Sequence, residues 1–203
     1  MEWNILFMGP VGAGKTKAIR SISDIEVVNT DEEATDETRL LKQNTTVSMD
    51  VGTLKLDGAD KLRLLGSPGQ DRFDFMWDIL IEQAKGIILV LDHSRSNPLS
   101  DLDHFITAIE DRLQSRSLPI VICVTHMDSV SSRSLQSYEN YLQQRIFRCI
   151  DMLPPVVEMD ARDSLQVRVV LIVMTALLEM CERFPKVATN VTGDKVSRPE
   201  FLH

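Results

Sequence analysis

The stretch "GPVGAGKT" at residues 9–16 decides the fold of this 203-residue chain. It has the spacing G-x-x-x-x-G-K-T and follows an apolar, strand-like run at residues 4–9. A glycine-rich loop between a strand and a helix presents backbone N–H groups and a helix N-terminus, and both attract phosphate. Lys15 is placed to contact the β- and γ-phosphates of a nucleotide, and the Thr16 hydroxyl to bind Mg²⁺. We therefore expect a phosphate site with backbone donors from Gly12 to Thr16.

Composition excludes several other classes of protein. Lys and Arg total 22 and Asp and Glu total 30, so the formal net charge is −8, which is a poor match for nucleic acid or an anionic membrane. The cysteines at 123, 149 and 181 form no CxxC pair, which indicates neither a zinc site nor a disulfide framework. The most apolar stretch, residues 169–178, is shorter than the ~20 residues that span a bilayer. We expect a cytoplasmic protein without a signal peptide or an integral membrane segment.

Strand-like and helix-length segments alternate along the chain. Strands are predicted at 4–9, 61–66, 86–92, 120–126 and 155–160, and helices at 15–22, 71–84, 98–115, 132–148 and 163–183. Such alternation is typical of βαβ units with helices on both faces of a sheet. We predict an α/β fold of the P-loop NTPase type, with about six mostly parallel strands and one antiparallel strand.

The antiparallel strand comes from a predicted hairpin over residues 45–66. Apolar residues alternate over 47–51 and then change parity by Leu54. A β-bulge at Gly52 would reconcile the two halves, and "DGAD" at 57–60 would form the turn.

Two later segments indicate which base is bound. "VTHMD" at 124–128 ends a buried strand, where the Asp128 carboxylate would accept hydrogen bonds from N1–H and the 2-amino group of guanine. Adenine does not offer this pair of donors. "EMDAR" at 158–162 ends the next strand, where the Ala161 N–H would donate to guanine O6. The alternative for Asp128 alone is a helix cap or turn residue.

The motifs "GPVGAGKT", "TTVSMDVG", "GSPGQDRFDFMWDIL", "VTHMD" and "MDAR" together resemble the Ras-like small GTPases over about residues 3–183. More closely, the chain is similar to the bacterial MglA-type (gliding-motility GTPase-like) branch. The resemblance implies binding of GTP and GDP with Mg²⁺, and hydrolysis of GTP to GDP and phosphate. It makes Thr46 the switch I threonine, Gly69 the switch II glycine and Gln70 the residue that orients water.

Together with the motifs above, the resemblance implies three sets of positions. Nucleotide contacts fall on Gly9, Val11, Gly12, Ala13, Gly14, Lys15, Thr16, Lys17, Gly69, Thr125, His126, Asp128, Asp160, Ala161 and Arg162. Catalysis falls on Lys15, Thr46 and Gln70, with Arg39 as the internal candidate for a catalytic arginine, and Mg²⁺ on Thr16 and Thr46. For Arg39 the alternative is a solvent-facing charge that balances its acidic neighbours.

Several positions depart from the small-GTPase pattern. Gly66 replaces the aspartate that holds Mg²⁺ through water, so we expect weaker metal binding or a larger role for Thr16, Thr46 and phosphate oxygens. Pro68 fits the MglA-type branch. Thr125 and His126 replace the usual asparagine and lysine, and we expect Thr125 to tie its loop to the P-loop in part and His126 and Arg162 to stack on the base. A branched side chain at Val11 crowds the catalytic space, so slow hydrolysis is expected.

The segment "RFDFMWDIL" at 72–80 has two apolar faces when drawn as a helix. Phe73, Met76, Trp77 and Leu80 form one face, which would cover the sheet, and Phe75 and Ile79 form the other. A second apolar face suggests a partner. The resemblance suggests a Roadblock/longin-type regulator, together with an effector that contacts this region.

Three functions stay open on these observations: a GTP-hydrolysing switch, a GTP-loaded binding scaffold with little hydrolysis, and a P-loop ATPase or phosphotransferase. Residues 1–183 are expected to form one small GTPase domain. Residues 184–203 are expected to form a poorly ordered tail.

Overall fold

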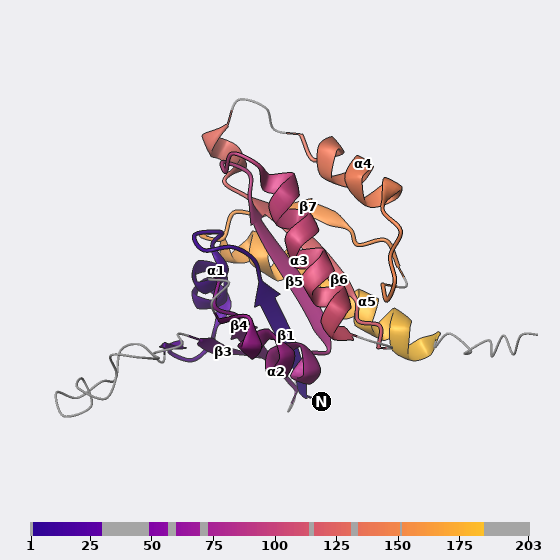
Figure 1. Cartoon of the computed structure of the whole chain (residues 1–203). Coiled ribbons are helices and arrows are strands. Elements are labelled where there is room, and N and C mark those ends of the chain that lie inside the picture. The colour runs from indigo at the N-terminus through magenta and orange to yellow at the C-terminus, as the bar shows by residue number, and fades with distance from the viewer. Residues whose placement is uncertain are drawn as a thin grey trace, which may run out of the picture.

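A seven-stranded sheet with the order β2-β3-β4-β1-β5-β6-β7 forms the centre of the protein (Figure 1). The computed structural model describes residues 2–29, 49–56, 60–69, 73–113, 116–130, 134–150 and 152–184. The strands are β1 (Glu2–Met8), β2 (Val28–Asn29), β3 (Asp50–Lys55), β4 (Lys61–Gly66), β5 (Gly86–Asp92), β6 (Ile120–Thr125) and β7 (Val156–Glu158).

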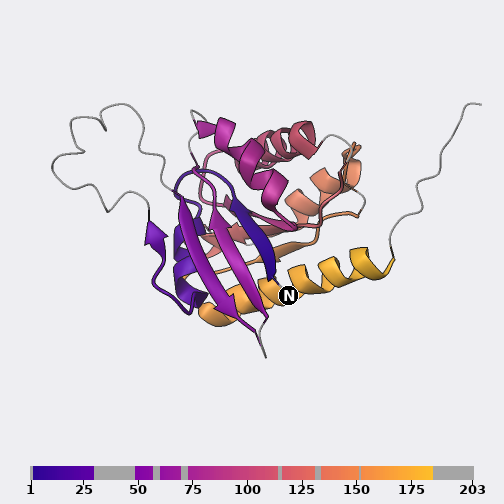
Figure 2. The ribbon, with the colours of Figure 1, turned by 90° about the horizontal axis from the view of Figure 1, so that it is seen from below.

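Five α-helices cover the two faces of the sheet. They are α1 (Lys15–Ile22), α2 (Phe75–Gln83), α3 (Pro98–Leu113), α4 (Gln136–Gln144) and α5 (Ser164–Arg183). Side chains of α1 and α5 join one buried apolar cluster with the sheet, and side chains of α2, α3 and α4 join the other. Figure 2 shows the sheet between these two layers. Strands buried on both faces explain the nearly continuous apolar runs of β5 and β6.

Strand β3 is the antiparallel strand of the sheet. It pairs antiparallel with both β2 and β4, while β1 pairs parallel with β4 and β5, and β6 pairs parallel with β5 and β7. The predicted α/β fold is therefore confirmed. The two-residue edge strand β2 raises the number of strands from the expected six to seven.

The predicted β-bulge at Gly52 is wrong. Strands β3 and β4 pair residue by residue over all six positions. The parity changes because both faces of this strand are covered: Val51 packs against the α2–α4 layer and Leu54 against the α1–α5 layer. Position 52 requires glycine for another reason: a Cβ there would lie 2.7 Å from Cγ2 of Ile19 on α1.

The predicted helices have the right order, but α2 and α4 are shorter than predicted, and α2 spans Phe75–Gln83 rather than 71–84. α1 agrees at both ends, and α5 begins one residue later than predicted. α4 is shorter than the predicted 132–148, because the helix ends at Gln144 and Arg145 is extended. The predicted tail lies outside the described residues, Phe184 excepted.

Helix α5 is the one helix of the described ranges that is long and apolar enough to cross a membrane. Its inward face nevertheless packs against the sheet in the core. The buried residues are Val167, Val170, Leu171, Met174 and Leu178. Length and composition alone are therefore weak grounds for a membrane span.

Candidate nucleotide-binding site

The P-loop follows β1 and wraps over the start of α1, at the edge of the sheet where the parallel strands end. Gly9 has φ 138°, and a Cβ there would lie 2.0 Å from the carbonyl oxygen of Val90 on β5. Gly14 has φ 99°, and a Cβ there would lie 3.0 Å from Cβ of Ala161. No side chain caps the N-terminus of α1, and its first turn carries no acidic residue. Apart from the Ala13 amide, which donates to the Pro10 carbonyl oxygen at 3.3 Å, the loop can therefore present its amides to an anion, as the motif predicts.

Backbone carbonyl groups of the P-loop hold the Lys15 side chain in place. The side chain is buried, and Nζ donates to the carbonyl oxygens of Gly9, at 2.7 Å, and of Pro10, at 2.8 Å. Burial lowers the pKa of Lys15 to about 8, and the nearby Asp50 carboxylate partly offsets this effect. Gly69 approaches the same group, since a Cβ there would lie 2.8 Å from Lys15 Nζ. Lys15 and Gly69 thus meet where the motif and the resemblance place the terminal phosphate.

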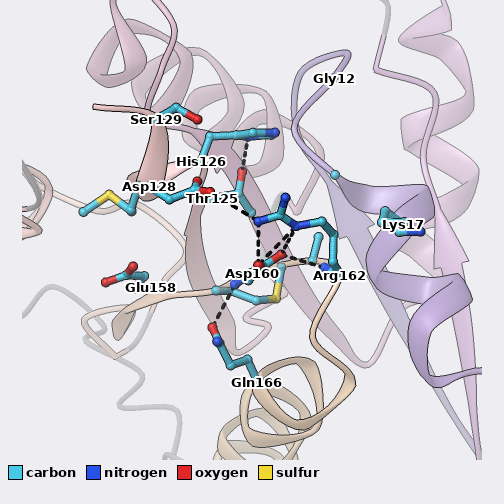
Figure 3. A pocket seen from close by; sticks show the side chains of 14 residues that line it. Gly12, Lys17, Thr125, His126, Asp128, Ser129, Glu158, Asp160, Arg162 and Gln166 are labelled. Atoms are coloured by element: carbon cyan, nitrogen blue, oxygen red, sulfur yellow. Dashed lines mark hydrogen bonds and ion pairs between the residues drawn. The ribbon is translucent and has the colours of Figure 1, made fainter. Parts of the chain in front are cut away.

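A cavity of about 490 Å³ opens beside the P-loop (Figure 3). Ligand sites in proteins usually measure roughly 300–1,000 Å³, so a nucleoside fits this space. Three predicted segments meet here: the P-loop, the loop after β6 and the loop after β7. The lining residues are Gly12, Gly14, Lys17, Thr125, His126, Met127, Asp128, Ser129, Glu158, Met159, Asp160, Ala161, Arg162 and Gln166.

Thr125 ties the loop after β6 to its neighbours. Its buried hydroxyl oxygen lies 2.9 Å from the carbonyl oxygen of Ala13 and 3.0 Å from that of Leu91. The single hydroxyl proton can be donated to one of these carbonyls at a time. The contact with Ala13 is the tie to the P-loop expected of Thr125. His126 follows with φ 57°, and its Nδ1 lies 3.1 Å from Thr125 Oγ1.

Arg162 crosses the cavity between two carboxylates (Figure 3). Its Nη2 lies 3.2 Å from Oδ2 of Asp128 and 2.8 Å from Oδ2 of Asp160. Hydrogen bonds from Arg162 lower the pKa of Asp160 to about 2, and both carboxylates raise the pKa of the guanidinium. Sequence reasoning placed all three residues at the site but missed this network, which joins residues 34 positions apart.

Asp50, the first residue of β3, is a site residue that sequence reasoning missed. Its carboxylate is buried and accepts a hydrogen bond from the Thr16 hydroxyl. The described residues hold no cluster of three or more His, Cys, Asp or Glu side chains suited to a metal. Asp50 and Thr16 do supply two hard oxygen donors beside the P-loop, which is the donor chemistry Mg²⁺ prefers. The residues present therefore fit a Mg²⁺ ion held partly by phosphate and water.

Three predicted residues, Arg39, Thr46 and Gln70, lie outside the described residues, so their roles stay predictions. The predicted faces of α2 are confirmed. Trp77 is buried, and its Nε1 donates to the carbonyl oxygen of Pro68, at 3.2 Å. Phe75 is 52% exposed on the other face.

The P-loop, the adjoining cavity and the sheet order define a nucleotide-binding P-loop protein of small-GTPase-like fold. The chain belongs to the family described as "Conserved hypothetical ATP binding protein", whose sequence model matches residues 24–179 and so begins after the P-loop. It is also similar to Ras-related protein Rab-12 of Mus musculus and of Homo sapiens. Identity to each is 27% over 145 residues, which cover 69% of this chain and 54% of the relative. The chain therefore spans about half the length of these relatives.

Proposed function

We propose that this protein is a molecular switch that binds GTP and GDP and hydrolyses GTP slowly, with help from a partner. The observation that carries the proposal is that Asp128 lines the same cavity as Gly12 and Gly14 of the P-loop. A carboxylate there can accept both guanine donors, N1–H and the 2-amino group, while the P-loop amides hold the phosphates.

Hydrolysis on this site depends on positioning and charge rather than covalent chemistry. Lys15 offsets the negative charge that builds on the phosphate oxygens, and the Gly69 backbone lies close enough to sense the terminal phosphate. The proposed role of Gln70 is to orient the attacking water, and that of Thr46 is to close the site. Mg²⁺, when bound, supplies further positive charge beside the phosphates. Arg39 is the internal candidate for the arginine that stabilises the transition state.

Slow hydrolysis is proposed because Val11 projects from the P-loop. Its side chain is 55% exposed, and a Cβ on Gly69 would lie 2.7 Å from the Val11 backbone nitrogen. A branched side chain at this place takes up room that a catalytic arginine needs. Gly66 and Pro68 support a place in the MglA-type branch, and a cytoplasmic location is proposed with it.

A partner surface is proposed on the outer face of α2. Phe75 and Ile79 are 52% and 55% exposed, and they lie on the helix that follows the switch II segment. A regulator that binds this face would sense the nucleotide through Trp77, whose indole contacts Pro68. The resemblance favours a regulator of the Roadblock/longin type and a separate effector.

A P-loop ATPase is the second candidate, because the family to which the chain belongs is described as ATP binding. A nucleotide panel separates the two. We expect GTP and GDP to displace a fluorescent guanine nucleotide at lower concentrations than ATP. Asp128→Asn should weaken guanine binding and favour xanthine nucleotides, because one acceptor becomes a donor.

The matched control is Asp111→Asn, an exposed carboxylate on α3 that also pairs with an arginine, Arg148, at 2.7 Å. This variant should bind all nucleotides as wild type does. Equal binding of ATP and GTP by the wild-type protein would contradict the guanine assignment. Tighter binding of ATP than of GTP would favour the ATPase instead.

A further inference from the structure

Asp50 and Gly66 face each other at the end of the β3–β4 pair, next to the P-loop. A Cβ on Gly66 would lie 3.1 Å from Cβ of Asp50 and 3.2 Å from its Oδ2. The Asp50 side chain therefore borders the space into which a side chain at 66 would project, together with Cδ1 of Ile19 on α1, at 3.0 Å. Resemblance to the small GTPases leads one to expect a carboxylate at 66, and here the neighbouring strand brings a carboxylate to the same place.

The Asp50 carboxylate is half satisfied. Asp50 is only 7% exposed, and its Oδ2 accepts a hydrogen bond from the Thr16 hydroxyl. Oδ1 is buried and has no hydrogen-bond partner in the described part of the chain. A buried carboxylate oxygen without a partner is costly, so such an atom is expected to serve a cation or a bound water.

No other described group supplies the missing partner. The ammonium of Lys15 is close enough for Asp50 to raise its pKa, but Nζ donates to the carbonyl oxygens of Gly9 and Pro10 instead. The Thr16 hydroxyl has one proton and two lone pairs. Because that proton goes to Asp50, the lone pairs of Thr16 are left to coordinate a cation.

We propose that Asp50 replaces the missing aspartate at 66 and holds the nucleotide-bound Mg²⁺ together with Thr16. Asp50 has two roles: Oδ2 orients the Thr16 hydroxyl, and Oδ1 accepts from the metal or its water shell. The inference rests on the proposed nucleotide site, but not on the identity of the base.

The test measures release of fluorescent GDP and fluorescent ADP, each in Mg²⁺ and in EDTA. The wild-type protein should release its nucleotide at least about tenfold more slowly in Mg²⁺ than in EDTA, because the metal links the phosphates to Thr16 and Asp50. In Asp50→Asn the two rates should agree within about twofold. The double variant Asp50→Gly/Gly66→Asp returns a carboxylate to the usual strand and should recover most of the Mg²⁺ effect.

The thermal unfolding temperature of each variant shows whether a lost Mg²⁺ effect comes from a folding defect instead. Asp50→Asn should unfold in EDTA at or above the temperature of the wild-type protein, because it removes an unpaired buried charge. Glu110→Gln, which alters a buried carboxylate on α3 paired with Arg145, should lower that temperature and leave the Mg²⁺ effect intact. Asp50→Asn that keeps the full Mg²⁺ effect overturns the proposal, as does a wild-type release rate that Mg²⁺ does not change. Preference for ADP would overturn only the guanine assignment.

Discussion

Arg162 Nη2 lies 3.2 Å from Asp128 Oδ2, across the cavity that should hold the base. Both side chains are more than half exposed. In the proposed guanine complex the base would take over this contact, while Arg162 keeps its hydrogen bonds to Asp160. Exposed ion pairs contribute little, up to about 1 kcal/mol, so Arg162 is a weak competitor for the carboxylate.

Arg162→Ala should therefore change the dissociation constant for GDP by less than about fivefold, which corresponds to about 1 kcal/mol. Base selectivity should be kept, because Asp128 remains. Arg148→Ala is the control, since Arg148 pairs with Asp111 away from the cavity. Titration calorimetry measures both constants. A loss of guanine selectivity in Arg162→Ala would show that the arginine, and not Asp128, reads the base.

Thr125→Val should weaken nucleotide binding by about tenfold and lower the free energy of unfolding by about 1 kcal/mol. The valine keeps the shape of the side chain but removes the hydroxyl that lies between the carbonyl oxygens of Ala13 and Leu91. Thr125→Ser retains the hydroxyl and should bind nearly as wild type does. Calorimetry and urea unfolding measure the two effects. Equal behaviour of the valine and serine variants would mean that the tie to the P-loop does not matter.

The motifs identified the segments that meet at the cavity because each motif is local in the sequence. A P-loop requires only a strand, a short loop and a helix, and α1 begins at Lys15 as predicted. The loops after β6 and β7 were placed correctly because parallel strands end at the same edge of a sheet.

The predicted bulge at Gly52 is the reason that the sequence did not indicate Asp50 as a site residue. A bulge at Gly52 would have put Asp50 and Leu54 on opposite faces of β3. The regular pairing puts them on the same face, toward α1, and so brings Asp50 to Thr16. The sequence alone did not show that helices cover both faces of this strand. The Arg162–Asp128 pair was missed because it depends on how two loops meet.

Trp77→Ala should lower the stability strongly, whereas Phe75→Ala should leave it nearly unchanged. Trp77 is buried in the α2–α4 layer, so its truncation should cost about 3–5 kcal/mol of the free energy of unfolding. Phe75 is half exposed, so Phe75→Ala should change this free energy by less than about 0.5 kcal/mol. Nucleotide affinity of Phe75→Ala should stay within a few-fold of wild type, while binding of a regulator is lost. Urea unfolding and calorimetry test the pair, and a strongly destabilised Phe75→Ala would contradict a surface role.

Val11→Gly should speed GTP hydrolysis by about tenfold, which corresponds to about 1.4 kcal/mol of the activation barrier. The side chain of Val11 is largely exposed at the P-loop, and its removal opens the space beside Gly69 for water and for an arginine. Nucleotide affinity should change little, because the loop amides and Lys15 remain. Single-turnover phosphate release measures the rate. The control is Val169→Ala, on the exposed face of α5; alanine is chosen there because glycine would weaken the helix. An unchanged rate in Val11→Gly, with and without a partner, would show that Val11 is not what limits hydrolysis.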